Sequence, residues 1–238
     1  MKDNFLEQIL KSIKITGSYI QIDELKFRVK KMVGQGYHKQ VFEIDDGENN
    51  KVIKIIRKEA EKIESALLSF QQAIENQKIL DDFGVNYAKI VSFDKKGPPY
   101  RFLIQEKIAE NGISAVELIK KKLLKENDIS QMAKVINKLE IGRKWQIDTS
   151  PFNWFRVKDK MIYTGGSVYE YDENWSFKKV GLWQWLNLEF IAKTNKQATK
   201  IPSKFDSQKL SKEWVNLETK EVKWWKKYLN STIQPKGN

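Results

Sequence analysis

The chain has 238 residues, of which 40% are hydrophobic and 31% charged, so it has room for a sizeable core and does not have a disordered composition. It contains no cysteine and one histidine, which excludes disulfide scaffolds, cysteine nucleophiles and zinc ribbons and argues against a Ser-His-Asp hydrolase. The 43 Lys and Arg against 31 Asp and Glu give a formal net charge of +12, which favours anionic partners, although a Lys-, Asn- and Ile-rich composition alone produces the same charge.

The first half of the chain is predicted to be rich in β-strands. Hydrophobic side chains recur at helical spacing over residues 1–15, so residues 1–19 are expected to be a helical N-terminal extension. A second helix is expected over residues 59–82, and Gly84 is suited to end it. Five strands are predicted from hydrophobic runs bounded by turn residues, at 27–33, 40–44, 51–56, 88–93 and 100–108. Residues 20–108 therefore form a β-rich lobe.

The second half is predicted to be mainly helical, with a loop at 148–153 and a short hairpin over 154–164. Helices are expected at 113–125, 128–142, 180–194 and 207–229. We therefore expect an α+β protein with two lobes, the second over residues 109–238, and a ligand site in the cleft between the lobes. No hydrophobic run is long enough to span a membrane and no signal-peptide core is present, so a soluble, cytoplasmic protein is expected.

Two glycines lie between the first two predicted strands, in the segment that runs from Gly34 through Gly36 to Val41. Glycines let a backbone turn tightly and approach a phosphate group closely, but they are also common in ordinary hairpins. No Gly-Lys-Ser/Thr follows, and neither does a helix, so the segment is neither a Walker loop nor a dinucleotide-binding fingerprint.

A lysine, Lys54, lies inside an otherwise apolar predicted strand. Burying an ammonium group is costly unless it reaches an anion or water, so Lys54 either binds a phosphate or extends to solvent from an edge strand. The predicted helix at 59–82 can supply a carboxylate to this lysine. Glu75 is the first choice, with Glu64 and Glu61 as alternatives.

A carboxylate and an amide lie five residues apart in the segment Asp148-Thr-Ser-Pro-Phe-Asn153, just before the predicted hairpin. Such a loop can hold Asp148 near an attacking hydroxyl group while Asn153 binds a magnesium ion. Loops that combine Asp or Asn with Pro are also frequent in proteins without this chemistry.

The order of these features resembles the protein-kinase-like superfamily, including its aminoglycoside phosphotransferase and lipopolysaccharide kinase relatives. The order is a Gly-rich hairpin, a strand lysine, a helix carboxylate, two strands, a linker, long helices, an Asp-x4-Asn loop and a hairpin, over about residues 27–170. The resemblance implies a β-rich N-lobe, a mainly helical C-lobe, and ATP and Mg²⁺ as cofactors.

The resemblance also implies a role for individual residues. Lys54 would hold phosphate oxygens, Glu75 would orient Lys54, and residues 104–108 would form the hinge that contacts adenine. Asp148 would be the catalytic base and Asn153 a magnesium ligand. The residues implied to bind the cofactor are Gly34, Gly36, Val41, Lys54, Glu75 and Glu106.

Several positions depart from the pattern of the superfamily. Lys39 replaces the third glycine of the loop, and Gln-Ile at 146–147 replaces the usual His-Arg. The superfamily has a metal-binding acid about a dozen residues after the Asn, but here residues 163–166 read Tyr-Thr-Gly-Gly. The next acids, Glu170 and Asp172, would serve only if the loop after the hairpin folds back.

Three functions are therefore compatible with the sequence. The first is an ATP-dependent phosphotransferase that acts on a hydroxyl group of an unidentified small molecule or protein. The second is a pseudokinase that senses nucleotide or binds a partner without turnover. The third is a basic nucleic-acid-binding protein that uses Lys- and Trp-rich C-terminal helices such as the one containing residues 223–227. Asp148→Asn would abolish transfer in the first case, and steep salt dependence of binding would mark the third.

Overall fold

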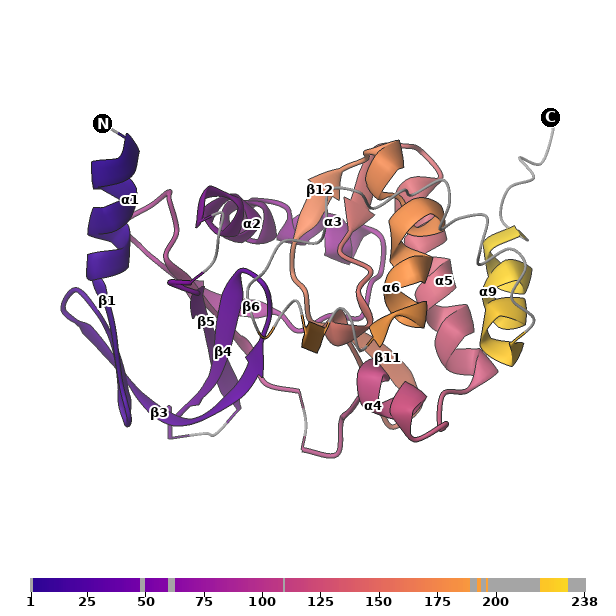
Figure 1. Cartoon of the computed structure of the whole chain (residues 1–238), viewed down its shortest axis with the longest axis horizontal. Coiled ribbons are helices and arrows are strands. Elements are labelled where there is room, and N and C mark those ends of the chain that lie inside the picture. The colour runs from indigo at the N-terminus through magenta and orange to yellow at the C-terminus, as the bar shows by residue number, and fades with distance from the viewer. Residues whose placement is uncertain are drawn as a thin grey trace. The chain divides into compact units, whose positions relative to one another are not determined.

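The structure is a computed structural model, and it describes residues 2–47, 50–59, 63–108, 110–188, 192–193, 196 and 219–230 (Figure 1). The chain divides into two compact units. The first comprises Met1–Glu75, Ala88–Ile108 and Ala192–Ile201, and the second comprises Asn76–Tyr87, Ala109–Ile191 and Pro202–Asn238. The predicted single boundary after residue 108 is thus replaced by units that each draw on separate stretches of the chain.

A seven-stranded antiparallel sheet forms the first unit, in the order β1-β2-β3-β4-β5-β7-β6. Two helices accompany it, α1 (Lys2–Lys11) and α2 (Ile63–Glu75). The strands are β1 (Ile13–Thr16), β2 (Tyr19–Ile22), β3 (Leu25–Gln35), β4 (Lys39–Ile44), β5 (Lys51–Ile56), β6 (Ile90–Phe93) and β7 (Phe102–Glu106).

The prediction that residues 1–19 are helical is wrong beyond α1. Ile13 and Ile15 alternate with polar residues, as in a strand, and a turn at Gly17 returns the chain as β2. The long strand β3 pairs with β2 through its first residues and with β4 through its last ones, so the N-terminal hairpin extends the main sheet (Figure 1).

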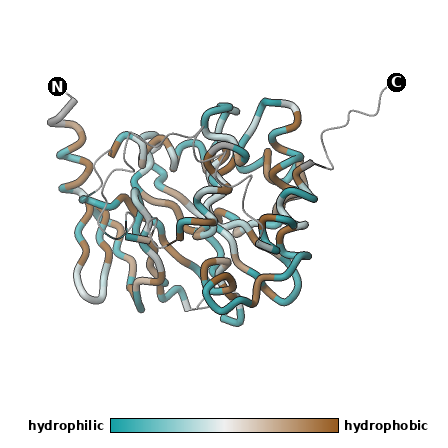
Figure 2. Tube along the Cα trace, turned by 45° about the vertical axis from the view of Figure 1, so that its right-hand side comes forward, coloured by the Kyte–Doolittle hydropathy of each residue, from teal (hydrophilic) through white to brown (hydrophobic). Residues whose placement is uncertain are grey.

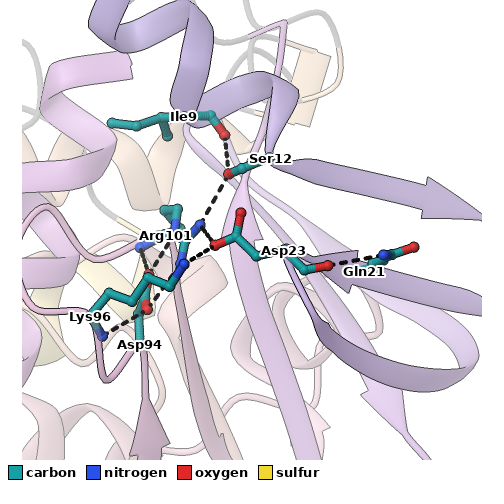
Figure 3. A network of polar contacts seen from close by, with 7 residues as sticks. All are labelled: Ile9, Ser12, Gln21, Asp23, Asp94, Lys96 and Arg101. Carbon is teal, nitrogen blue, oxygen red and sulfur yellow. Dashed lines mark hydrogen bonds and ion pairs between the residues drawn. The ribbon is translucent and has the colours of Figure 1, made fainter.

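A buried arginine fastens this N-terminal extension to the turn between β6 and β7 (Figure 3). Arg101 donates to both carboxylate oxygens of Asp94, at 2.6 and 3.1 Å, and also to the Asp23 carboxylate and to Ser12 Oγ. Hydrogen bonds from Arg101 and then Lys96 lower the pKa of Asp23. Because Asp94 is only 1% exposed, loss of Arg101 would leave a buried carboxylate without its cationic partner.

The predicted helix at 59–82 is interrupted at Asn76, which has φ −100° and ψ 8° and separates α2 from α3 (Gln77–Asp82). The Asn76 side chain donates to the carbonyl oxygen of Val168 at 3.0 Å, within the second unit. An asparagine is a weak helix former whose side chain competes for hydrogen bonds, which accounts for the break.

The second unit is mainly helical and carries two small sheets. Besides α3, its described α-helices are α4 (Ala115–Lys120), α5 (Glu126–Glu140), α6 (Leu182–Leu186) and α9 (Lys220–Asn230). One sheet has the order β11-β10-β8 and the other pairs β12 with β9. Their strands are β8 (Ile113–Ser114), β9 (Trp145–Ile147), β10 (Trp154–Val157), β11 (Lys160–Tyr163) and β12 (Val168–Glu170). The predicted helix over 207–229 lies partly outside the described residues.

Most of the described tryptophans of the second unit pack in its core. Trp154, Trp185 and Trp225 are at most 5% exposed, and the ring centroids of Trp185 and Trp225 lie 5.3 Å apart. Trp224 also packs against this core, so the two tryptophan rings in α9 serve packing. Hydrophobic and hydrophilic residues alternate along the helical turns, as expected of helices with one buried face (Figure 2). None of the described helices is long and apolar enough to cross a membrane.

The observed architecture confirms the predicted α+β fold, with a β-rich first unit and a mainly helical second unit. It also confirms the predicted order from the Gly-rich hairpin β3–β4 to the hairpin β10–β11. This order of elements is the one that the resemblance to the protein-kinase-like superfamily implies.

Candidate functional site

Three of the predicted cofactor-binding residues lie in one row across the sheet of the first unit. Gly34 on β3 pairs with Val41 on β4, Val41 pairs with Lys54 on β5, and Lys54 pairs with Leu103 on β7. Directly paired residues of an antiparallel sheet point to the same face, so Gly34, Val41 and Lys54 share a face. Lys54 is 9% exposed there, between apolar neighbours on its own strand.

The two glycines of the hairpin are not required by the fold. Neither Gly34 nor Gly36 is among the residues with positive φ. A Cβ at Gly34 would lie 3.8 Å from Val41, and one at Gly36 would lie 3.8 Å from the Lys39 carbonyl oxygen, which are ordinary contacts. The protein itself would accept alanine at both positions, so any need for glycine would come from a ligand.

Lys39, which replaces the third glycine, has a structural contact. Its ammonium group donates to Ser69 Oγ on α2 at 2.6 Å and lies 4.9 Å from the centroid of the Phe70 ring. This contact ties the hairpin to α2.

The structure does not bring the predicted carboxylate to Lys54. Glu75 is exposed at the last residue of α2, and its carboxylate accepts a hydrogen bond from Gln71 at 3.0 Å. Glu64 is exposed in the first turn of the same helix, and Glu61 lies outside the described residues.

The predicted hinge shows which side chains face the same way as Lys54. β7 runs to Glu106, and the side chains of a strand alternate, so Glu106 points to the face opposite Lys54. Glu106 therefore has only its backbone to offer on that face. Gln105 shares the face of Lys54, is 1% exposed and donates to the carbonyl oxygen of Ala88 at 3.0 Å.

A buried carboxylate that the sequence analysis missed lies on the same face. Glu43 on β4 is 5% exposed and pairs across the sheet with Val52. Its carboxylate lies 3.0 Å from Lys107 Nζ and 3.9 Å from Lys31 Nζ. The alternation of β4 places Glu43 on the face of Val41, which was the signal that could have found it.

Arg57 is a second residue that the sequence analysis missed. It is 6% exposed, and its guanidinium donates to the carbonyl oxygens of Gly36 at 3.3 Å and of Lys196 at 2.7 Å. Its backbone N–H donates to the His38 carbonyl at 2.9 Å. Arg57 thus links the tip of the Gly-rich hairpin to a residue far along the chain but within the same unit.

In the second unit, the loop at 148–153 has a defined geometry. Asp148 is exposed, and its Oδ1 accepts a hydrogen bond from the Ser150 N–H at 3.0 Å. Residues Pro151–Asn153 form a short 3₁₀-helix, and the Asn153 side-chain amide donates to the Asp148 carbonyl oxygen at 3.3 Å. Because its nitrogen is engaged in this way, Asn153 turns its amide oxygen away from that carbonyl.

The loop is held from two sides. The N–H of Thr164, just after β11, donates to the Asn153 carbonyl at 2.7 Å. Trp185 Nε1 donates to the Thr149 carbonyl at 2.9 Å, and a Cβ at Gly181 would lie only 2.4 Å from Thr149 Oγ1. The structure therefore brings Asp148 and Asn153 together in a packed loop with an exposed carboxylate.

In residues 163–166, the segment expected to hold the second metal ligand, the ring of a tyrosine occupies the space beside the backbone. Tyr163 is fully buried, and its hydroxyl group donates to the Ser167 carbonyl at 3.1 Å. Burial, with a smaller effect of the Asp148 charge, raises the pKa of Tyr163 well above its usual value. Gly165, about a dozen residues after Asn153, lies against this ring.

The next two acidic residues, Glu170 and Asp172, do not lie at the loop 148–153. β12 runs antiparallel to β9, with Val168 opposite Ile147 and Glu170 opposite Trp145. Glu170 is therefore about 10 Å further along the strand from Asp148, at roughly 3.3 Å per residue. Asp172 caps the next short helix by accepting from the Asn174 N–H at 2.9 Å.

These residues do not fit the two-ligand magnesium site that the resemblance implies. Asn153 offers one neutral amide oxygen, and Gly165 offers no side chain. In the described ranges, no three His, Cys, Asp or Glu side chains gather where they could hold a metal ion.

No family model matches the sequence, and no curated protein matches it. Among solved structures, WbdD is similar with a TM-score of 0.48 and 12% identity over 92% of this chain and 54% of WbdD. Vaccinia related kinase 3 is similar with a TM-score of 0.44 and 15% identity over 72% of this chain and 57% of that protein. A co-crystal structure of WbdD with the kinase inhibitor LY294002 gives a TM-score of 0.48 and 12% identity over 92% of this chain and 48% of that one. The chain spans about half the length of these proteins.

Proposed function

We propose that this protein binds a nucleoside triphosphate, ATP in the simplest case, and transfers its terminal phosphoryl group to a hydroxyl group. The observation that carries the proposal is the loop at 148–153. Its carboxylate is exposed and oriented by the Ser150 N–H, and the Asn153 amide fixes the backbone of the same Asp148. A fixed and exposed carboxylate is what orientation or deprotonation of an acceptor hydroxyl requires.

The proposal gives each unit its own task. In the first unit, Lys54 holds phosphate oxygens with its ammonium group, and Gly34 and Gly36 let the hairpin backbone approach the phosphates. In the second unit, Asp148 accepts the proton of the acceptor hydroxyl. That oxygen forms a bond to the γ-phosphorus while the bond to the β–γ bridging oxygen breaks, and the nucleoside diphosphate leaves. Because the magnesium ligands do not fit, no step is assigned to a metal ion.

The proposal is tested by Asp148→Asn with Asp159→Asn as a matched control. Asp159 lies in the exposed turn of the hairpin β10–β11, so its change removes the same charge from the same unit. Phosphoryl transfer to a panel of hydroxyl acceptors should fall at least a hundredfold in Asp148→Asn, in line with the loss of a general base, and remain in the control. ATP affinity should change little in both. Equal transfer by both variants would refute the role of Asp148.

A second candidate function is a nucleotide-binding pseudokinase, and two observations favour it. Glu75 is exposed and hydrogen-bonded to Gln71, and position 165 carries no acid. In this case the wild-type protein binds ATP but releases no diphosphate with any acceptor. Measurable transfer that depends on Asp148 would exclude this candidate.

A further inference from the structure

The hairpin β10–β11 leads into residues 164–166, the stretch in which the resemblance places the second metal-binding acid. Trp154 pairs with Tyr163 at the open end of the hairpin, and Asn153 immediately precedes β10. The chain leaves β11 through Thr164, whose N–H donates to the Asn153 carbonyl at 2.7 Å, and reaches Gly165. Position 165 therefore follows directly on the residue that is hydrogen-bonded to Asn153.

A side chain cannot be placed at position 165 beside Tyr163. A Cβ there would lie 2.3 Å from Tyr163 Oη, 2.5 Å from Cζ and 2.7 Å from Cε2. Real Cβ atoms essentially never approach another atom below 3.0 Å, so Tyr163 or the backbone would have to move. An aspartate at 165 would need the same space for its Cβ before its carboxylate could reach anything.

Tyr163 is held too firmly to move aside easily. It is 0% exposed, and its ring centroid lies 5.3 Å from that of Trp154. Its N–H donates to the Asn86 carbonyl at 2.8 Å and its hydroxyl to the Ser167 carbonyl at 3.1 Å. The segment 163–167 thus wraps around the ring of its own first residue.

We infer that Tyr163 excludes an acidic side chain from position 165 and that this protein binds its nucleotide as the metal-free anion, an inference that rests on the proposed function. A divalent cation such as Mg²⁺ is bound in proteins mainly through carboxylates and substrate phosphates. Of the two polar side chains of the loop, Asn153 offers a neutral amide oxygen, and the proposed function assigns the Asp148 carboxylate to the acceptor hydroxyl. The negative charge of the phosphates is neutralised by Lys54 and by the net positive charge of the chain.

The steric part is tested without nucleotide. Gly165→Asp should lower the melting temperature by about 5 °C or more, as overpacking of a closed site does in a chain of this length. Gly142→Asp is the control, because Gly142 is exposed, has no positive φ, and a Cβ there meets nothing within 4 Å. In a Tyr163→Leu background, which removes the clashing ring atoms, the further cost of Gly165→Asp should fall towards that of the control. Equal melting temperatures for Gly165→Asp and Gly142→Asp would overturn the inference.

The ligand part is tested on the wild-type protein, so it does not depend on any variant folding. Calorimetric titrations of ATP with EDTA and of ATP with excess Mg²⁺ should give dissociation constants within about threefold of each other. Affinity at least tenfold tighter with Mg²⁺ would overturn the metal-free binding. If ATP binds under neither condition, the proposed function fails together with this ligand assignment, whereas the melting temperatures still decide whether Tyr163 closes position 165.

Discussion

The glycines in two parts of this protein have opposite steric surroundings. In the hairpin β3–β4, a Cβ at Gly34 or Gly36 would have no neighbour closer than 3.8 Å. In the second unit, a Cβ at Gly165 would lie 2.3 Å from Tyr163, and one at Gly181 would lie 2.4 Å from both Phe177 and Thr149. The glycines that stand out as a motif are optional for the fold, while those in the inconspicuous segments are required by packing.

This difference separates two reasons for a glycine. At positions 34 and 36, the open space leaves room for something outside the protein, which is consistent with a backbone that approaches phosphates. At positions 165 and 181, the space is already occupied by side chains of the same unit. The following predictions test this contrast, from the largest expected effect to the smallest.

Gly181→Ala should destabilise the protein most. Gly181 has helical dihedrals, φ −59° and ψ −48°, which alanine adopts without strain, so only the clash with Phe177 and Thr149 opposes the change. We expect the free energy of unfolding to fall by about 3 kcal/mol, as in overpacked cores. Denaturant unfolding of this variant and of the open-site control Gly142→Ala measures the effect. Similar stability of the two variants would show that the packing around Gly181 yields readily.

Glu140→Gln should stabilise the protein at alkaline pH. Burial raises the pKa of Glu140 to about 7, against the hydrogen bond from the Phe177 N–H and the charge of Lys178, both of which lower it. The folded state therefore holds the proton between about pH 4.5 and 7, and wild-type stability falls as the pH rises through this range. Glutamine keeps an acceptor for Phe177 without the charge, so the variant should be about 2 kcal/mol more stable at pH 8.

The pH dependence supplies the control for this prediction. The advantage of Glu140→Gln should shrink towards zero as the pH falls to about 4.5 and below, where wild-type Glu140 becomes protonated in both states. Unfolding curves at pH 4.5, 6 and 8 measure it, and a difference that is constant across them would contradict the account. Since Phe177 packs against Gly181, this result also reports on the packing around the tightly surrounded glycines of the second unit.

Arg57→Ala should lower the stability of the protein by weakening the contacts of the hairpin β3–β4. It removes the donors to the Gly36 and Lys196 carbonyl oxygens, and we expect a loss of about 1 to 2 kcal/mol, typical of buried groups that lose a partner. Arg28→Ala is the control, because its ion pair with Asp45 is long, at 3.6 Å, and Arg28 is largely exposed. Chemical denaturation and ATP titration of both variants provide the measurements. Equal losses for the two arginines would argue that Arg57 does not hold the hairpin tip.

Gly34→Ala and Gly36→Ala should change stability least, by less than about 1 kcal/mol, because the protein leaves room for the added methyl group. The same variants should weaken ATP binding by about tenfold if the backbone there approaches phosphates. A stability loss comparable to that of Gly181→Ala would abolish the contrast between the two segments. Unchanged ATP affinity would remove the ligand-based reason for these glycines.

The sequence predicted those elements whose pattern is local. The strand Lys51–Ile56 has the predicted bounds, and the two strands of the hairpin β10–β11 lie within the predicted range 154–164. The strand β1 was missed because Ile13, with Phe5 and Ile9 before it, also fits a helical spacing. The break at Asn76 was missed because it depends on a hydrogen bond to Val168, far along the chain.

The candidate site was also predictable only where its residues follow a local sequence pattern. Spacing alone brought out Lys54 and the pair Asp148 and Asn153, and it showed that residues 163–166 contain no acid. It did not show why, because the cause is the position of the Tyr163 ring over Gly165. Glu75 was chosen from its place in a predicted continuous helix, but that helix ends there and leaves its side chain exposed.

The most direct test of the proposed function is calorimetric titration of ATP into the wild-type protein, Lys54→Met and Lys51→Met. Lys51 lies on the same strand as Lys54 but on its other face, where it pairs with Asp46 at 2.9 Å. We predict that ATP binds to the wild type and to Lys51→Met with similar affinity and that Lys54→Met weakens binding at least tenfold. No binding to the wild type, or equal binding to all three proteins, would contradict the assignment of Lys54 to the phosphates.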